Sequence, residues 1–250
     1  MNILVVNDDG IQSAGLQALV RYLAKVGDVY VCAPDGQRSA KSHSVTLGQN
    51  ITVEETQVPG AKAAYKTSGT PADCTKIGLQ FFPERGIGID VVCSGINMGS
   101  NLGRDTLYSG TVGAAAEAAL GGYHAVAVSV DDHDAVYFET AGKLAAQVIP
   151  KICGKTDPSV VMNINVPNLP PEKIRGVKFA HLGNRYYDDK FHRNPDGTYA
   201  LSGQPSRDDR HGSDSDVVAV HENYAVITPL QFDFTDHKTL EDLNEWSFNL

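Results

Sequence analysis

Short apolar runs alternate with longer amphipathic segments along the first two thirds of the chain. Residues 3–6 form a continuous run of branched apolar residues, which is typical of a strand buried on both faces. Residues 16–23 then repeat apolar positions at helical spacing, and Gly27 stands where a helix C-terminus often has glycine. A second apolar run, 29–33, ends at Pro34. This strand, helix, strand order predicts parallel strands joined by a right-handed crossover.

The alternation continues after an extended stretch over residues 44–67. The patterns predict, in order, a helix over 72–82, a strand over 91–93, an alanine-rich helix over 112–120, a strand over 125–130, a helix over 135–149 and a strand over 160–166. Such alternation predicts an α/β fold, a Rossmann-like three-layer sandwich with a mostly parallel sheet. We assign residues 1–170 to this core and expect it to carry the catalytic site.

Residues 171–250 have a different pattern, polar and rich in turn residues. The sequence Asn-Pro-Asp-Gly at 194–197 has the composition of a β-hairpin tip. Because the polar stretch has too few apolar residues for a core of its own, we expect projecting β-hairpin arms that a partner surface stabilises. A returning strand over 224–230 and a terminal helix over 240–250, which carries Trp246, follow. This part would serve oligomerisation and would not be an independent domain.

Composition and charge narrow the classes of function. The 250 residues are 42% hydrophobic and 20% charged, which excludes long disordered tracts and fibrous repeats. Lys and Arg number 21 against 30 Asp and Glu, which gives a net charge of −9. Because proteins that bind polyanions carry the opposite sign, we expect neither a nucleic-acid polymer nor a membrane as partner.

Cysteine spacing and the N-terminal sequence indicate the compartment. The four cysteines, at 32, 74, 93 and 153, have no CxxC spacing and no histidine pair nearby, so we interpret them as reduced core residues. The N-terminus has no basic region, its apolar run is short, and no window approaches the ~18 apolar residues of a membrane span. These features predict a soluble cytoplasmic protein.

The candidate chemistry lies after the strands. In an open parallel sheet, ligands bind beyond the carboxyl ends of the strands, where loops converge. Asp8 and Asp9 follow the first strand directly. Adjacent carboxylates repel each other, and a hard divalent cation held through oxygen explains the pair. A helix N-cap with a turn is the alternative explanation for the same two residues.

Two further loops follow strands in the same way. Ser39 lies in a loop rich in hydroxyl groups, whose alternative reading is a solvated polar loop. Residues 94–111 form a segment rich in glycine, asparagine and serine that contains Asn97. It ends in Ser-Gly-Thr at 109–111, where helix N–H groups and hydroxyls can hold a phosphate, although Thr111 could instead cap the helix. The chain has no GxGxxG, P-loop, HExxH or GxSxG motif.

Several motifs resemble, in order and spacing, those of the SurE family (survival protein E, stationary-phase survival protein), which are metal-dependent 5′/3′-nucleotidases. They are NDDG, RSAKSHSVT, SGTPADC, VCSGINMGSNLG, YSGTVGAAAEA, NINVP and YAVITPL, and they extend over nearly the whole chain. The chain departs from the family pattern at Ala40, where glycine is usual, at Arg104, where an acid is common, and at its C-terminal end. The first two departures would tune the geometry and charge of the phosphate pocket.

The resemblance implies a specific set of site residues. One divalent cation, Mg²⁺ or Mn²⁺, would be held by Asp8, Asp9, Ser39 and Asn97. Two carboxylates supply charge, a hydroxyl and an amide supply neutral oxygens, and positions remain for water and a substrate oxygen. Catalysis would depend on Asp8 and Asp9, with Asp9 a candidate to orient the attacking water. The residues that would bind the phosphate are Asn101, Ser109, Gly110 and Thr111.

These features predict a phosphomonoesterase that hydrolyses nucleoside 5′- and 3′-monophosphates. One alternative is a non-enzymatic receiver-like phospho-signalling domain, which also has paired acids after its first strand. That domain needs a phosphoacceptor Asp after its third strand, yet no Asp lies between Asp35 and Asp73. The other alternative is a phosphatase with Asp8 as the nucleophile, whose acids are usually one residue apart. The resemblance also implies a homodimer or homotetramer with exchanged C-terminal segments.

Overall fold

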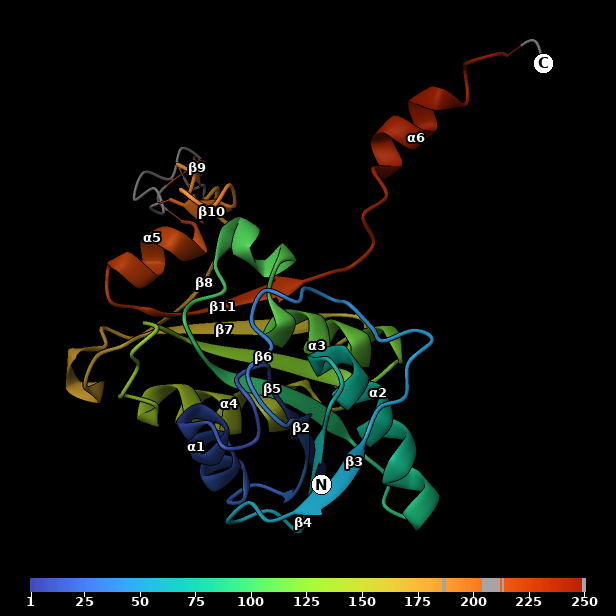
Figure 1. The fold of residues 1–250 in the computed structure, drawn as a ribbon, viewed down its shortest axis with the longest axis vertical. Helices are drawn as coiled ribbons and strands as arrows, with labels where there is room; N and C mark the ends of the chain where they lie inside the picture. The colour runs from blue at the N-terminus through green and yellow to red at the C-terminus, as the bar shows by residue number, and fades with distance from the viewer. Residues whose placement is uncertain (186–187, 204–211, 213, 249–250) are drawn as a thin grey trace.

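The main sheet runs through the body of the molecule (Figure 1). The computed structural model describes residues 1–185, 188–203, 212 and 214–248. The nine strands of the sheet are, in chain order, β1 (Asn2–Val6), β2 (Asp28–Pro34), β3 (Val53–Thr56), β4 (Ala63–Thr67), β5 (Val91–Met98), β6 (His124–Asp131), β7 (Val161–Pro167), β8 (Val177–Phe179) and β11 (Ala225–Leu230). Their order across the sheet is β3-β4-β2-β1-β5-β6-β7-β11-β8. Among the described strands of this sheet, only the pairs β3–β4 and β7–β11 are antiparallel, so the prediction of a mostly parallel sheet is confirmed.

Helices cover both faces of this sheet and complete the three layers. On one face lie α1 (Ala14–Leu23) and α4 (Glu139–Ile152), and on the other α2 (Pro71–Phe81) and α3 (Gly110–Leu120). Strand β1 has a continuous apolar run because helices cover both of its faces. Ile3 and Val5 pack toward the first pair of helices, while Leu4 and Val6 pack toward the second. Each such side chain, when fully buried, stabilises the fold by about 1.5–3 kcal/mol.

Three predicted boundaries in this core are wrong. Helix α1 ends at Leu23 with Ala24 as its C-cap, so Gly27 does not close it. A Cβ at Gly27 would lie 2.5 Å from the carbonyl oxygen of Met1, so glycine there permits a close backbone approach. Helix α4 covers Glu139–Ile152, later than the predicted 135–149. Strand β5 continues to Met98 instead of ending at Cys93, since its ladder with β6 resumes after a register shift between Ser94 and Asn97.

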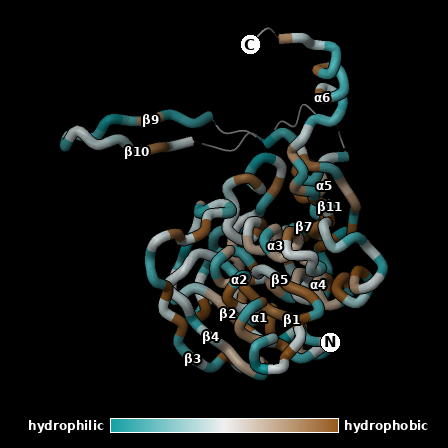
Figure 2. Tube along the Cα trace, turned by 90° about the vertical axis from the view of Figure 1, so that its right-hand side faces the viewer, coloured by the Kyte–Doolittle hydropathy of each residue, from teal (hydrophilic) through white to brown (hydrophobic). Residues whose placement is uncertain are grey.

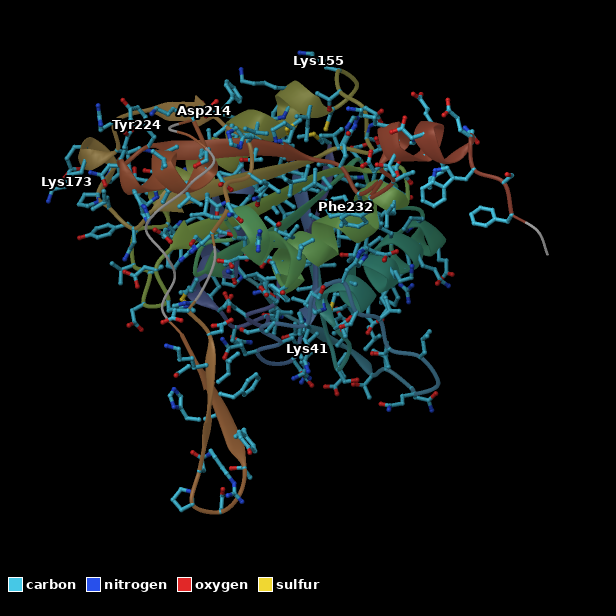
Figure 3. All side chains as sticks on the ribbon, turned by 90° about the horizontal axis from the view of Figure 1, so that it is seen from above. Lys41, Lys155, Lys173, Asp214, Tyr224 and Phe232 are labelled. Carbon is cyan, nitrogen blue, oxygen red and sulfur yellow. The ribbon has the colours of Figure 1, made fainter. Side chains whose placement is uncertain are left out.

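The C-terminal part adds to the sheet and also projects from it. Strands β8 and β11 lie after residue 170 yet pair within the main sheet. The predicted hairpin is present as β9 (Lys190–Arg193) and β10 (Tyr199–Ser202), an antiparallel pair that extends away from the body (Figures 2 and 3). Its tip is closed by the Asn194 N–H, which donates to the Thr198 carbonyl at 2.7 Å. Residues 204–211 and 213 of the polar stretch lie outside the described part of the chain.

Two short helices differ from the prediction. Helix α5 (Asp216–His221) was not predicted, and it packs against β11 through Val217 and Val220. The terminal helix α6 begins earlier, at His237, because Asp236 caps it by accepting the N–H of Thr239. It ends at Leu243, so Trp246 lies after the helix and is exposed. In Figure 1, α6 lies away from the sheet.

The cysteines and the helices also bear on the predictions made from the sequence. All four cysteines are free thiols, and Cys32, Cys74 and Cys93 are buried in the core, whereas Cys153 is only half-buried. Among the described residues, none of the helices combines the length and the apolar character that a membrane crossing requires.

Candidate active site

The carboxyl ends of the central strands open into a cavity of 560 Å³. All three loops selected from the sequence reach it. The predicted site residues that line it are Asp8, Ser39, Asn97, Asn101 and Ser109. Asp9, Gly110 and Thr111 lie next to this lining without forming part of it. The segments selected by the strand-end rule therefore lie together at one cavity.

Asp8 stands at the carboxyl end of β1 and is only 4% exposed. The Thr111 hydroxyl donates to its Oδ1 at 2.5 Å, and a Cβ added at Gly110 would lie 2.9 Å from its Oδ2. Burial raises the pKa of Asp8 to about 6, the Thr111 hydrogen bond opposes this, and the neighbouring charge of Asp9 adds to it. The start of α3 is thus built around this carboxyl group.

Asp9 connects the ends of two adjacent strands. Its Oδ2 accepts the backbone N–H of Met98, at the end of β5, at 3.1 Å. Burial raises the pKa of Asp9 and the hydrogen bond from Met98 opposes the rise. The N-cap of α1 is Ser13, which accepts the N–H of Leu16. The acidic pair therefore does not cap the helix, and that alternative explanation is wrong.

Ser39 lies on the exposed loop after β2, and backbone contacts hold this loop over the cavity. The Arg38 N–H donates to the Asp8 carbonyl at 2.6 Å, and the Ser42 N–H donates to the Tyr108 carbonyl at 3.0 Å. Ala40 has φ 56°, a left-handed conformation that favours glycine. The departure from the family's usual glycine therefore falls at a strained position in the cavity wall.

Asn97 reaches the cavity because of the irregularity in β5. Its Nδ2 donates to the carbonyl of Gly99 at 2.7 Å. That hydrogen bond fixes the orientation of the carboxamide and uses its nitrogen, so Oδ1 is the atom that can serve as a ligand to a cation. A sequence pattern that shows only a glycine-rich loop gives no sign of this register shift.

The N-terminus of α3 forms another side of the cavity. Ser109 is the N-cap and accepts the N–H of Val112 at 3.0 Å, so the reading of Thr111 as the cap is wrong. The first backbone N–H groups of the helix lack intrahelical partners and can bind an anion. The Thr111 side chain is fully buried, and its hydroxyl faces Asp8. Asn101 lines the cavity from the preceding loop, and its Nδ2 donates to Ser129 Oγ at 2.8 Å.

The donor atoms at this cavity fit one hard divalent cation. Within the described ranges, no cluster of three or more His, Cys, Asp or Glu side chains is placed to hold a metal ion. A cation here would therefore rely on two carboxylates plus neutral hydroxyl and amide oxygens, which are the ligands that Mg²⁺ and Mn²⁺ accept. The buried Asp8 carboxyl, whose ionised form burial disfavours, is a group that a cation would stabilise.

Sequence reasoning missed several residues of the cavity wall, and three of them carry polar groups that bear on its chemistry. His133 lines it from the loop after β6, and Tyr108 lines it beside Ser109. Asp105 also lines it and forms an ion pair with Arg185 at 3.3 Å. The rule of strand ends would have selected His133, because the loop over 132–138 follows a parallel strand like the other loops. Nothing in the sequence indicates the pairing of Asp105 with Arg185, which are 80 positions apart.

Comparisons with known proteins agree with this architecture. Residues 3–189 match the family model for "Survival protein SurE". The chain is 41% identical to "5'-nucleotidase SurE" of Pelotomaculum thermopropionicum, covering 98% of this chain and 95% of that protein. It is 38% identical to the protein of the same name in Petrotoga mobilis, covering 98% and 99%. The crystal structure of the SurE protein from Aquifex aeolicus is similar with a TM-score of 0.83 and 32% identity, over 98% of both chains. The chain belongs to the SurE family.

Proposed function

We propose that this protein is a metal-dependent phosphomonoesterase that hydrolyses nucleoside 5′- and 3′-monophosphates to nucleoside and phosphate. One observation carries the proposal: the buried acidic residue Asp8 contacts the N-terminus of α3 at the wall of a single cavity. The acidic pair can attract a cation, and the helix N-terminus can bind the phosphate beside it. The name "5'-nucleotidase SurE" that the relatives carry supports the substrate class.

Asp8, Asp9, Ser39 and Asn97 would hold one Mg²⁺ or Mn²⁺. When bound, such a cation withdraws charge from a phosphoryl oxygen and lowers the pKa of a coordinated water. Thr111 would act behind this set, because its hydroxyl donates to Asp8 and favours the ionised carboxylate. Asp9 is held at the strand ends by the Met98 N–H, and its carboxylate is the candidate to orient the attacking water.

The phosphate would be bound from the opposite wall. Ser109 and Asn101 line the cavity, and the N–H groups of Gly110 and Thr111 belong to the first turn of α3. These donors suit the equatorial phosphoryl oxygens, over which negative charge spreads in the transition state. For Thr111 we propose a contact through the backbone N–H, since its hydroxyl is used by Asp8.

The geometry disfavours both alternatives. An aspartyl nucleophile needs a carboxylate oxygen free for in-line attack on phosphorus, whereas one oxygen of Asp8 accepts the Thr111 hydroxyl and the other is the one that would bind the cation. A receiver-like domain needs an acceptor Asp beside the acidic pair. At the end of β5, the strand next to β1, this chain has Asn97, an amide that cannot take up a phosphoryl group.

A substrate panel tests the proposal. Purified protein is treated with EDTA, dialysed and assayed with the 5′- and 3′-monophosphates of adenosine, guanosine, cytidine and uridine, with and without added Mn²⁺. We expect phosphate release only when the metal is restored. Single turnover in ¹⁸O-water should place one labelled oxygen in the phosphate, and acid quenching should leave no phosphate on the protein. Full activity after exhaustive chelation, or phosphate recovered on Asp8, would refute the proposed chemistry.

We also propose that the chain works as a homodimer or homotetramer in the cytoplasm. The hairpin shows Phe191, Tyr199 and Leu201 on one face, all exposed, and an isolated two-stranded hairpin is marginally stable in water. A second subunit that covers this face would stabilise the hairpin. The buried free thiols suit a reducing compartment. Light scattering tests the assembly: a monomer of 26.8 kDa at micromolar concentration would contradict it.

A further inference from the structure

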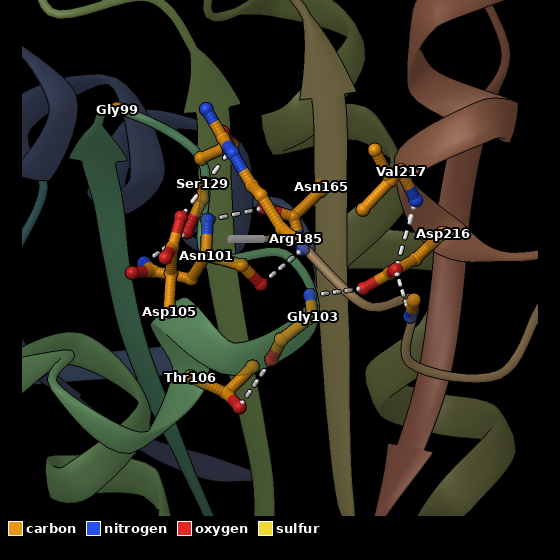
Figure 4. Close-up of polar contacts among 12 residues, drawn as sticks. Gly99, Asn101, Gly103, Asp105, Thr106, Ser129, Asn165, Arg185, Asp216 and Val217 are labelled. Atoms are coloured by element: carbon orange, nitrogen blue, oxygen red, sulfur yellow. Dashed lines mark hydrogen bonds and ion pairs between the residues drawn. The ribbon is translucent and has the colours of Figure 1, made fainter. Parts of the chain in front are cut away.

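The loop that carries Asn101 is held by side chains from distant parts of the chain (Figure 4). Fully buried Asn165, on β7, makes two hydrogen bonds to the backbone of Asn101. Its Oδ1 accepts the Asn101 N–H at 2.7 Å, and its Nδ2 donates to the Asn101 carbonyl at 3.0 Å. Asn163, two residues earlier on the same strand, donates to that carbonyl at 2.9 Å. Both polar groups of the Asn101 backbone are therefore bound by one strand.

Polar residues are unexpected at these two positions. The face of β7 that carries Asn163 and Asn165 points toward α3, where a buried parallel strand ordinarily presents apolar residues. Burying a carboxamide without full hydrogen bonding is unfavourable, and the Oδ1 of Asn163 has no partner among the described residues. Stability of the sheet alone does not explain the two residues. Both residues hydrogen-bond to the backbone of Asn101.

The side chain of Asn101 is fixed as well. Its Nδ2 donates to the hydroxyl of Ser129, a fully buried residue on β6, at 2.8 Å. With its backbone held by β7 and its amide held by β6, the Asn101 carboxamide has one orientation at the cavity wall. The remaining N–H of this amide is the group that would donate to a phosphoryl oxygen.

The rest of the loop is secured on either side of Asn101. Arg185 donates to Ser100 Oγ at 2.8 Å, and the buried Asp216 accepts the Gly103 N–H at 2.9 Å. These contacts fix where the loop runs. Among the described residues, Asn163, Asn165 and Ser129 are the ones whose side chains hydrogen-bond to Asn101 itself, so they bear most directly on its orientation.

We infer that Asn165, supported by Asn163 and Ser129, is a positioning residue that aims the Asn101 amide at the phosphoryl group during hydrolysis. The inference rests on the proposed function, in which Asn101 contacts the phosphate. It gives a role to the NINVP motif, whose two asparagines lie below the cavity and do not line it.

The first test is Asn165→Asp, which keeps the shape of the side chain. When the introduced carboxyl group is ionised, it has no donor and places negative charge against the Asn101 carbonyl, whereas in its protonated form it can both accept and donate as the amide does. We expect kcat for AMP at pH 8 to fall about tenfold to a hundredfold, because small displacements of a positioning group have effects of that size. The ratio of variant to wild-type kcat should recover as the pH is lowered toward 6.

A double-mutant cycle distinguishes an effect on the orientation of the Asn101 side chain from an unspecific loss of activity. If Asn165 acts through the Asn101 side chain, Asn165→Asp should lower kcat in the wild-type background and have little further effect on Asn101→Ala. Equal losses in both backgrounds would overturn the inference. Ser129→Ala, a change of one buried oxygen, is the second variant if Asn165→Asp folds poorly. It too should lower kcat only when Asn101 is present, and an unchanged kcat would overturn the inference.

Thr228→Val is the matched control. Thr228 lies opposite Asn163 on β11, is buried, and has a hydroxyl without a partner among the described residues. Its replacement should change neither kcat nor KM, and urea unfolding of each variant reports stability separately. The two hypotheses fail differently. A wild-type protein that releases no phosphate from any nucleoside monophosphate refutes the proposed function, whereas an active wild type with an additive cycle refutes only the positioning role.

Discussion

The hydrogen bond from Thr111 to Asp8 gives a measurable prediction about metal binding. Thr111→Val keeps the shape of a fully buried side chain and removes only the hydroxyl donor. A hydrogen bond to a charged group contributes about 1.5–3 kcal/mol. Because one pKa unit corresponds to about 1.4 kcal/mol, the pKa of Asp8 should rise by roughly 1–2 units above its value of about 6.

The rise should weaken metal binding in a pH-dependent way. A cation at Asp8 competes with a proton, so apparent affinity follows the ionised fraction of the carboxyl group. At pH 6 half of the wild-type carboxyls are ionised, and the variant should bind Mn²⁺ about 5- to 50-fold more weakly if its pKa lies roughly 1–2 units higher. By pH 8.5 the two proteins should bind almost equally, since both are then mostly ionised.

Electron paramagnetic resonance of free Mn²⁺ measures this binding without turnover. Thr75→Val is the matched control, because Thr75 is also fully buried on a helix next to the site but donates to the carbonyl of Ala114 and not to a carboxylate. It should lose about 1 kcal/mol of stability and keep its Mn²⁺ affinity. Equal Mn²⁺ binding by folded Thr111→Val and wild type at pH 6 would refute the reasoning, as would equal weakening by the control.

Three other predictions follow from the site and its supporting loops. Asp8→Asn and Asp9→Asn should each abolish phosphate release from AMP while circular dichroism stays native, because both residues lie beyond a strand end and hold the proposed cation. For Asp73, burial raises the pKa but hydrogen bonds from Thr46 and Thr70 outweigh it, so the pKa lies below its ordinary value. This carboxylate should therefore stabilise the fold above about pH 4 and lose that effect as the pH falls further, and thermal unfolding of Asp73→Asn between pH 3 and 7 should lack this decline. Ala40→Gly should relieve the left-handed conformation and raise the free energy of unfolding, measured in urea, by up to about 1 kcal/mol.

The core elements were predictable because their hydrophobic patterns are long and regular. The apolar run at residues 3–6 fits a buried strand, and the structure has β1 there. The spacing of apolar residues at 16–23 fits an amphipathic helix, and the structure has α1 there. Strand β5 was cut short because Ser94, Gly95 and Asn97 have the composition of a loop. Its continuation depends on hydrogen bonds to β6, which no local pattern reveals. The short helix α5 was missed for the same reason, since its stability comes from packing on β11.

The sequence was enough to predict which loops meet at the cavity, but not which side chains contact one another there. Asp8, Ser39 and Asn97 share one cavity because each follows a strand of one parallel sheet, and that rule needs no coordinates. The partner of Asp8 depends on how α3 is rotated against β1, which places Thr111 inward and Ser109 at the cap. The role of Asn165 depends on the register between β6 and β7, which the sequence does not encode locally.

The acidic pair also explains why the site would need a cation for stability as well as for chemistry. A carboxyl whose pKa is raised on folding is stabilising only while protonated, so the contribution of Asp8 is complete below about pH 4 and declines as the pH rises toward 6. Above that pH the buried charge costs the fold about 3 kcal/mol, taking roughly two pKa units at about 1.4 kcal/mol each. A ligand that binds only the folded state offsets such a loss in proportion to the logarithm of its concentration. At neutral pH the ionised Asp8 carboxylate would bind a cation, and the bound cation would in turn stabilise the folded state by compensating the buried charge. Among the described residues, the Thr111 hydroxyl is the side-chain group that already stabilises this charge, by donating a hydrogen bond to it.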